Sequence, residues 1–384
     1  MKNSETKILN NSRNTKDKLL FTPGPVTTSK TVKEAANIDL ESNDSIFITY
    51  VKQIRERLLT LAHVESPEYE SVIIPGSGTH GVESVISSAI SSKGMLLNIV
   101  NGANGRRISK IARIHSIPLL EIIYNENQLP DFKEIESFLK KNRQITHVAA
   151  VHCETSSGLL NPIAEIGEIC ARYNKNFIVD ALSTFGAYDI SLKELNISYL
   201  ISGSDKCIEG IPGFSYVLLK RSLLDECKYQ VRSLSLDLYD QWLGLNTTGE
   251  FRFRPPVHAL LAFNVALNEL ESEGGINGRA ERYSVNNALL VGEMRELGFE
   301  MYLSAQMRSY IVTSFMFPHH PDFSFEKFYT HLNEKGLIIS PGKINKSDCF
   351  RIANIGQLYP HDIQKLIDTI EGVLYDLKIE LVEL

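Results

Sequence analysis

Short apolar runs alternate with helical patterns through residues 71–219, and this alternation constrains the fold more than any other feature of the chain. The runs are short enough to be buried strands, and several segments between them repeat apolar residues with the period of a helix. Strands that alternate with helices predict a mostly parallel sheet with helices on both faces. The expected class is therefore α/β, with strands at 71–74, 95–100, 119–124, 146–151, 177–180, 199–201 and 215–219.

The rest of the chain predicts a second, smaller unit. Residues 30–62 predict one helix with an apolar face. A later helical pattern ends at Gly274 and Gly275, and the shorter strands and helices that follow are typical of an α+β unit. A chain of 384 residues is long enough for two domains. We expect a polar N-terminal arm at 1–18, a large domain at 19–275 and a small domain at 276–384.

Charge and cysteine content exclude several classes of function. The formal net charge is −6 at pH 7 and no basic block stands out, which argues against a nucleic-acid partner. Residues 1–18 lack the apolar core of a signal peptide, and no apolar run is long enough to span a membrane. The five cysteines are scattered without CxxC spacing, which fits reduced thiols and neither a disulfide framework nor a zinc site. We expect a cytoplasmic protein that acts on small molecules, without a metal, nucleic acid or membrane.

Two strand ends carry the residues that first suggest chemistry. Lys206 follows the predicted strand at 199–201, in a loop that continues into a glycine-rich turn. A partly desolvated amine in such a loop can form a Schiff base with an aldehyde. Asp180 ends the predicted strand at 177–180, and α/β enzymes keep their ligand sites at such strand ends. An amine and a carboxylate on neighbouring strand ends suit pyridoxal phosphate, whose aldehyde binds a lysine and whose ring nitrogen pairs with an acid.

A glycine-rich segment supplies the third part of the predicted site. Gly76, Gly78 and Gly81 follow the strand at 71–74 and open a helix, so they match the dinucleotide-binding pattern G-x-G-x-x-G. That pattern also requires an acidic residue at the end of the next strand, and residues 101–104 contain none. A helix start that binds a single phosphate explains the same glycines without the missing acid. We therefore favour phosphate binding over nicotinamide binding.

The motifs along the chain resemble those of the class V, fold type I aminotransferases, which use pyridoxal 5'-phosphate. The resemblance is strongest to the branch of that family that transfers the amino group of 2-aminoethylphosphonate to pyruvate. The Pro-Gly-Pro and Gly-Ser-Gly motifs are shared across the family, whereas the stretches at 151–155 and 206–214 are specific to that branch. Matching segments occur in the family's order at 20–29, 76–79, 151–162, 206–214 and 350–356. The resemblance implies a large domain with a mostly parallel seven-stranded sheet, a smaller C-terminal α+β domain, and a homodimer with a shared active site.

The same resemblance implies a role for each matching residue. Lys206 would be the Schiff-base lysine and proton shuttle, and Asp180 would keep the ring nitrogen protonated. Arg351 would bind the anionic group of the substrate, because its planar guanidinium suits a carboxylate or a phosphonate. The substrate-binding positions would be Pro23, Gly24, Pro25 and Arg351, and the cofactor-binding positions would be Ser77, Gly78, Thr79, His80, Asn104, Thr155, Asp180, Leu182, Lys206 and Arg254.

Three of these positions depart from the family's pattern. Asn104 stands where the family has an aromatic residue that stacks on the cofactor ring, and His80 stands where it has Phe. We interpret His80 as a substitute stacking partner. Arg254 replaces a Thr that reaches the phosphate of the neighbouring subunit, and we expect it to contact that phosphate or to extend into the substrate pocket.

The implied reaction is a ping-pong transamination of 2-aminoethylphosphonate with pyruvate, which gives phosphonoacetaldehyde and alanine. The three departures leave other substrates open, namely those of alanine– or serine–glyoxylate transaminases, other aminophosphonates and aminosulfonates. A lyase on the same fold, a cofactor-binding protein without turnover and a dehydrogenase are the alternatives from other classes. The presence of both Lys206 and Asp180 argues against a loss of turnover.

Overall fold

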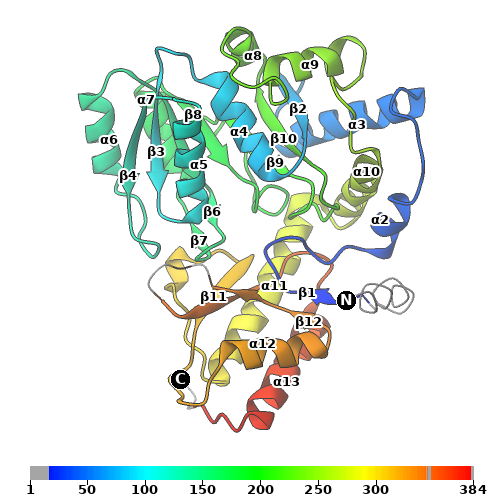
Figure 1. Ribbon diagram of the computed structural model, residues 1–384, viewed down its shortest axis with the longest axis vertical. Coiled ribbons are helices and arrows are strands. Elements are labelled where there is room, and N and C mark those ends of the chain that lie inside the picture. The colour runs from blue at the N-terminus through cyan, green and yellow to red at the C-terminus, as the bar shows by residue number, and fades with distance from the viewer. Residues whose placement is uncertain (1–16, 343, 345–346, 382–384) are drawn as a thin grey trace, which may run out of the picture.

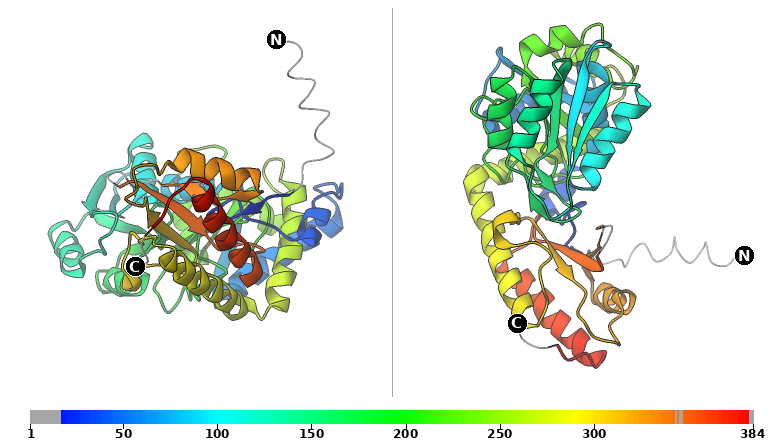
Figure 2. Two further views of the ribbon diagram at one scale, coloured as in Figure 1. Left: turned by 90° about the horizontal axis from the view of Figure 1, so that it is seen from below. Right: turned by 90° about the vertical axis from the view of Figure 1, so that its left-hand side faces the viewer.

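The computed structural model describes residues 17–342, 344 and 347–381. Figure 1 shows a larger lobe that carries most of the N-terminal two thirds of the chain, and a smaller lobe built mainly from its C-terminal third. The two lobes lie end to end, and one long helix runs along one side of both (Figure 2). Residues 1–16 of the predicted polar arm lie outside the described residues.

The large lobe is built on a seven-stranded sheet, as the alternation of strands and helices predicts. All strand pairs in it are parallel except those of β10, which runs antiparallel to both of its neighbours. The mostly parallel α/β fold is therefore confirmed. The strands follow the order β2 (Tyr69–Pro75), β10 (Phe214–Lys220), β9 (Tyr199–Gly203), β8 (Asn176–Asp180), β5 (Ile145–Val151), β3 (Met95–Val100) and β4 (Leu119–Ile123).

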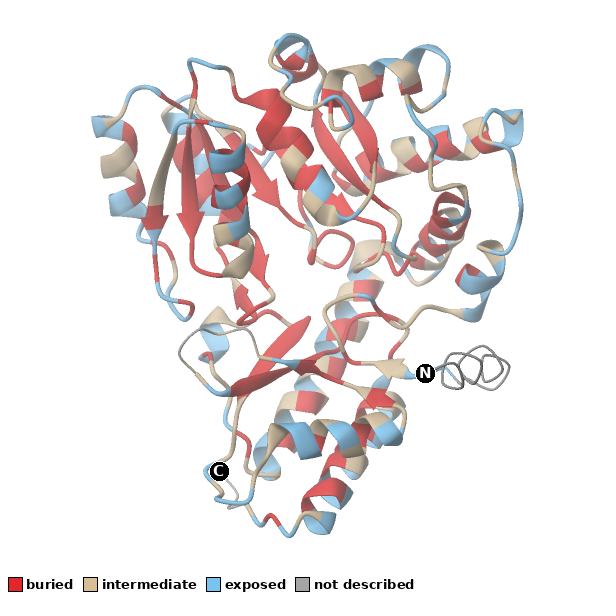
Figure 3. Ribbon diagram, viewed as in Figure 1, coloured by how far each residue is buried: buried red, intermediate tan, exposed pale blue. Residues whose placement is uncertain are grey.

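Burial of both faces explains why these strands are almost continuous apolar runs. Helices cover both faces of the sheet, and the strands are buried while the outer sides of the helices are exposed (Figures 2 and 3). A continuous apolar cluster extends from Val32 to Leu270. The covering helices include α4 (Gly78–Ala89), α5 (Ala103–Ile114), α6 (Phe132–Lys141), α7 (Ile163–Arg172), α8 (Arg221–Cys227), α9 (Leu238–Thr247) and α10 (Val257–Ser272).

The prediction of one helix over residues 30–62 is wrong, because two helices form there. They are α2 (Lys30–Ala35) and α3 (Ser45–Leu61). The intervening residues 36–44 are rich in Asn, Asp and Ser, whose side chains compete with helical hydrogen bonds. Asp44 starts the second helix, since its carboxylate accepts the N–H of Ile46.

The small lobe has its own apolar cluster around Phe299, Phe315 and Phe350. Its strands are β11 (Val312–Met316), β14 (Cys349–Ala353) and β13 (Ser340–Pro341), which form an antiparallel sheet, and β12 (Leu337–Ile338), which pairs with β1 (Leu19–Leu20). Phe21 also packs into this cluster, so the first residues of the predicted large domain lie with the small lobe. The division at residue 275 stays a prediction. The helices are α12 (Phe325–Glu334), α13 (Pro360–Asp376) and the short η1 (Ala305–Met307), and β6 (Cys153–Glu154) and β7 (Leu159–Leu160) form a small hairpin nearby.

Two further features concern the helices and the cysteines of the described residues. None of their helices combines the length and the apolar character that crossing a membrane requires. All five cysteines are buried free thiols.

A buried ionic cluster joins the loop after β9 to α11 (Gly275–Glu296), the long helix that runs along both lobes. Glu209 is 1% exposed and accepts hydrogen bonds from Arg282 at 2.8 Å and from Gln357 at 2.8 Å. Arg279 is fully buried, lies 3.3 Å from Glu209, and also donates to the carbonyl oxygen of Cys207. The cluster therefore fixes the backbone on both sides of Ile208, close to Lys206.

Replacement of Glu209 with Ala should lower the free energy of unfolding by about 3 kcal/mol, because the substitution leaves a buried arginine without one of its partners. Denaturation by urea, followed by circular dichroism, measures this loss. Glu281→Ala is the control, since Glu281 is exposed on the same helix and its loss should change stability by less than about 0.5 kcal/mol. Equal losses in the two variants would contradict the role of the cluster.

Candidate active site

A cavity of about 420 Å³ lies where the C-terminal ends of the parallel strands face the small lobe (Figure 1). Residues after β3, β5, β8 and β9 form one side of it, and residues of the N-terminal segment and the small lobe form the other. Eight of the predicted site residues line this cavity. They are Pro23, Gly24, Asn104, Thr155, Asp180, Leu182, Lys206 and Arg351.

The amine of Lys206 lies against the backbone of Gly24. A Cβ atom added to Gly24 would stand 1.6 Å from Lys206 Nζ, and the φ angle of Gly24 is +140°. Glycine is therefore required here both by space and by conformation. The Lys206 side chain keeps 21% of its surface exposed, and its Nζ lies 3.5 Å from Asp205 Oδ2. The amine is thus held at the cavity and remains accessible from it.

Asp180 is a buried carboxylate that forms no ion pair with any residue that the structure describes. Its side chain accepts the N–H of Leu182 at 3.1 Å, and the residue is 4% exposed. Burial raises the pKa of Asp180 to about 6, and the Leu182 N–H and the positive charges of Arg107 and Lys206 lower it only in part. An acid in this position favours a ligand that brings a positive charge to it.

Thr155 joins two of the predicted site residues. Asn104 Nδ2 donates to Thr155 Oγ1 at 3.4 Å, and Arg351 Nη1 donates to the Thr155 carbonyl oxygen at 2.7 Å. Arg351 Nε also donates to the carbonyl oxygen of Pro341 at 3.0 Å. Arg351 is 3% exposed and forms no ion pair within the described part of the chain. A surface ion pair therefore does not explain this arginine, and its charge is available to an anion in the cavity.

The start of α4 offers hydrogen-bond donors next to the cavity wall. The N–H groups of Gly78 and Thr79 have no acceptor among the residues that the structure describes, as is usual in the first turn of a helix. Leu182, which lines the cavity, packs so closely on Gly78 that a Cβ atom there would stand 2.3 Å from Leu182 Cδ2. Together with Ser77 at the N-cap, this turn presents an anion site.

Besides Ser77, Gly78 and Thr79, three further predicted site residues lie outside the cavity lining. His80 is exposed and turns back to cap α4, since its Nδ1 accepts the N–H of Ser77 at 3.0 Å. This contact does not place it as a stacking partner in the cavity. Pro25 is exposed beside the cavity, and Arg254 lines a separate surface depression with Asp39 and His258.

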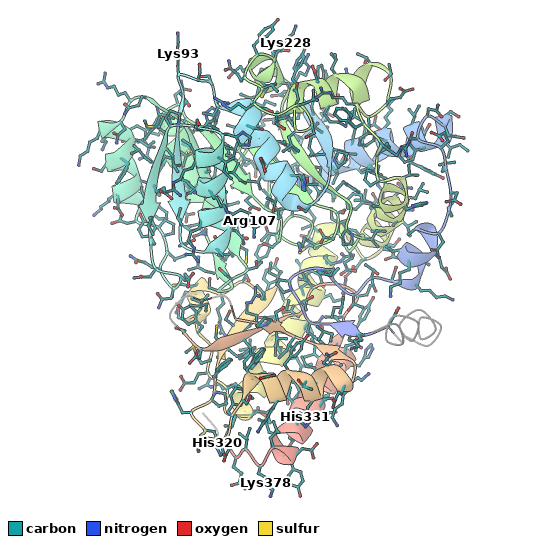
Figure 4. The ribbon with its side chains drawn as sticks, viewed as in Figure 1. Lys93, Arg107, Lys228, His320, His331 and Lys378 are labelled. Carbon is teal, nitrogen blue, oxygen red and sulfur yellow. The ribbon has the colours of Figure 1, made fainter. Side chains whose placement is uncertain are left out.

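Two residues that sequence reasoning assigned no role also belong to this region. Arg107, which Figure 4 labels, lies in the second turn of α5 and is among the residues that line the cavity. Glu154 is fully buried and accepts the N–H groups of Gly105 at 2.7 Å and Asn104 at 3.2 Å. Burial raises the pKa of Glu154 to about 7, and these N–H donors oppose the rise. Glu154 thus anchors the start of α5. The sequence does contain a signal for Arg107, because it follows Asn104 by about one helical turn.

The other reactive side chains near the cavity are poorly suited to act as base or nucleophile. His152 is buried with Nδ1 3.0 Å from Thr184 Oγ1, and burial lowers its pKa to about 3. Burial raises the pKa of Cys153 to about 12, so its thiol stays protonated at neutral pH. The chemistry that the cavity supports therefore centres on the amine of Lys206.

Asp180→Asn should stabilise the ligand-free protein above pH 6. The pKa of Asp180 is about 6 in the folded protein and 3.8 in its ordinary state, so between these two pH values the unfolded chain ionises while the folded chain keeps its proton. As the pH rises through 6, the folded chain must ionise a buried group, and stability is lost. Asn avoids this loss, which amounts to roughly 3 kcal/mol at ~1.36 kcal/mol per pKa unit.

The measurement is the difference in unfolding free energy between wild type and Asp180→Asn from pH 4 to pH 8. Asp322→Asn, at an exposed position, is the control and should show no such pH-dependent difference. A constant difference for Asp180→Asn across this range would show that the carboxyl does not titrate as described.

Comparisons with known proteins agree with this architecture. Residues 29–356 match the family model described as Aminotransferase class-V. Solved structures with the same fold include ureidoglycine–glyoxylate aminotransferase from Bacillus subtilis, with a TM-score of 0.88 and 22% identity over 96% of this chain and 95% of that one. Alanine–glyoxylate aminotransferase from Nostoc sp. has a TM-score of 0.87 and 22% identity over 94% and 96% of the two chains. The chain thus has the fold type I architecture.

Relatives of higher identity cover nearly the whole chain. The 2-aminoethylphosphonate–pyruvate transaminase of Bacillus cytotoxicus is 47% identical over 93% of this chain and 98% of its own length. The protein of the same name from Lysinibacillus sphaericus is 45% identical over 92% of this chain and 97% of its own length. With the family model and these relatives in agreement, the chain belongs to the class V aminotransferase family.

Proposed function

We propose that this chain is a pyridoxal phosphate-dependent transaminase that moves the amino group of 2-aminoethylphosphonate to pyruvate, giving phosphonoacetaldehyde and alanine. The observation that carries the proposal is one cavity that joins an accessible lysine amine, a buried carboxylate and an arginine that forms no ion pair among the residues that the structure describes. The relatives at 45–47% identity, whose names state this reaction, support the choice of substrates.

The residues present fit the three recognisable parts of pyridoxal phosphate. Asp180 is a buried acid that needs a cation, which a protonated ring nitrogen supplies. The N–H groups at the start of α4, which have no acceptor among the described residues, suit the phosphate, and Ser77, Gly78 and Thr79 would hold it. Lys206 would bind the aldehyde, and Thr155 and Asn104 would contact the ring. When bound, the cofactor supplies an electron sink for the carbon that carries the donor's amino group.

The chain's own residues would position the substrate and move its proton. Lys206 Nζ, held against Gly24, would take the proton from the carbon that carries the amino group as a general base, and would give that proton to the cofactor as a general acid. Asp180 would hold a buried negative charge in the lining of the cavity. Arg351 binds the phosphonate of the donor or the carboxylate of the keto acid, since both halves of a ping-pong reaction use one site.

The proposal includes a homodimer with a shared site in the cytoplasm. Arg254 lies outside the cavity of its own chain, which supports its predicted contact with the cofactor phosphate of a second copy, or its extension into that copy's substrate pocket. The free thiols support a reducing compartment.

Lys206→Ala should abolish the production of alanine from 2-aminoethylphosphonate and pyruvate, because the amine that moves the proton is lost. Its circular dichroism and thermal midpoint should stay close to those of the wild type, since the side chain is partly exposed. Lys193→Ala, at an exposed position, is the control and should keep full activity. Alanine production at the wild-type rate in the Lys206 variant would reject the assignment.

Arg351→Ala should weaken binding of the anionic donor by about 2–5 kcal/mol, the cost of removing one partner of a buried charged pair. The apparent Michaelis constant for 2-aminoethylphosphonate measures this effect, with Arg295→Ala as the exposed control. If the constant is unchanged, a different residue holds the anion.

Keto-acid dependence separates the proposed reaction from that of a lyase on the same fold. A transaminase releases one equivalent of product per active site from the donor alone, and pyruvate is needed for further turnover. Continuous product release without any keto acid would indicate a lyase. Turnover with other amines, and none with 2-aminoethylphosphonate, would point to the alternative donors.

A further inference from the structure

We propose that Arg107 is the second cation for the phosphonate group of the donor and sets the preference for a dianionic substrate. The inference rests on the proposed function, because it concerns the substrate of the same cavity. Four of the side chains that line the cavity are acidic or basic, and their charges determine how it binds an anion. They are Arg107, Asp180, Lys206 and Arg351.

In the proposed site, two arginines of the cavity are not used by the ring nitrogen or the aldehyde of the cofactor. Among the described residues that line it, Asp180 is the one carboxylate. In the proposed site, Asp180 pairs with the ring nitrogen and Lys206 is committed to the cofactor. The charges of Arg107 and Arg351 then remain for the substrate. A carboxylate carries one negative charge, whereas a fully ionised phosphonate carries two.

Within the described part of the chain, Arg107 acts on Asp180 through its charge alone, which lowers the pKa of that carboxyl. Its side chain is exposed at the cavity and makes no ion pair or hydrogen bond with any described residue. The neighbouring Arg106 differs in this respect, since it donates to Glu126 at 2.6 Å and is absent from the cavity lining. An unpaired guanidinium presents a planar set of donors that matches the oxygens of a phosphonate.

The placement of Arg107 is fixed by the contacts of α5. Glu154 anchors the first turn of this helix through the N–H groups of Asn104 and Gly105. Asn104 reaches Thr155, and Arg351 reaches the same residue from the small lobe. Arg107 follows Asn104 by three residues and so lies on the same face of the helix. Figure 4 places Arg107 near the centre of the molecule, beside α5. The two arginines therefore approach one cavity from different lobes.

The test compares the binding of two unreactive ligands of similar shape to the holoenzyme at mildly alkaline pH. Ethylphosphonate is a dianion there, and ethanesulfonate is a monoanion. Isothermal titration calorimetry should show that Arg107→Gln weakens ethylphosphonate binding about 10- to 100-fold, the range for a lost charge-assisted hydrogen bond. Ethanesulfonate binding should change by less than about threefold. Arg107→Lys, which keeps the charge without the planar donors, should recover part of the loss.

Arg106→Gln is the matched control, because it removes the same charge from the adjacent position outside the cavity. It should bind both ligands as the wild type does. Equal losses for the two ligands in Arg107→Gln, or no loss for ethylphosphonate, would overturn the inference. The wild type and its variants could show the expected binding pattern while the wild type fails to convert 2-aminoethylphosphonate. That result would reject the proposed function and leave the role of Arg107 in anion binding in place.

Discussion

The parallel pairing of β5, β8 and β9 is the constraint on which the whole site depends. Parallel strands end at the same edge of a sheet, so the residues that follow them are brought together. The pairing of β8 with β5 and β9 places Asp180 beside the residues that precede Thr155 and the loop that carries Lys206. The small lobe then closes this edge with Arg351 and Pro341. The cavity follows from strand order before any side chain is considered.

The energetic cost of the site is concentrated in buried polar groups. Burial raises the pKa values of the Asp180 and Glu154 carboxylates, and the two differ in the hydrogen-bond donors that they receive. Glu154 receives N–H donors from the start of α5 and becomes part of the scaffold. Asp180 receives one N–H and faces the cavity, which leaves room for a cationic ligand. The ionic cluster of Glu209 and Arg279 holds the loop after Lys206 in the same way that Glu154 holds α5.

Much of this architecture could be predicted from the sequence, because buried parallel strands leave continuous apolar runs and their ends are marked by polar residues. Asp180 and Lys206 were found in that way. The break between α2 and α3 was missed although Asp44 is a local capping signal, since the apolar period dominated the prediction. The pairing of β1 with β12 joins residues far apart in the chain, and no local pattern encodes it.

The position of a side chain relative to the cavity was the hardest feature to predict. The ring of His80 accepts the N–H of Ser77 at the start of its own helix, and its stacking on the cofactor stays a prediction. Arg107 was overlooked because one arginine in a helix resembles any exposed one. Only the three-dimensional structure shows that Arg106 is paired with Glu126 whereas Arg107 lines the cavity.

The measurement that tests the account most directly is the visible absorption of the holoenzyme before and after 2-aminoethylphosphonate is added without a keto acid. The account predicts a spectral change on addition of the amine, and recovery of the first spectrum when pyruvate follows. A bound cofactor whose spectrum stays unchanged with this amine would contradict the proposed donor. A protein that takes up no pyridoxal phosphate would contradict the assignment of Lys206 and Asp180.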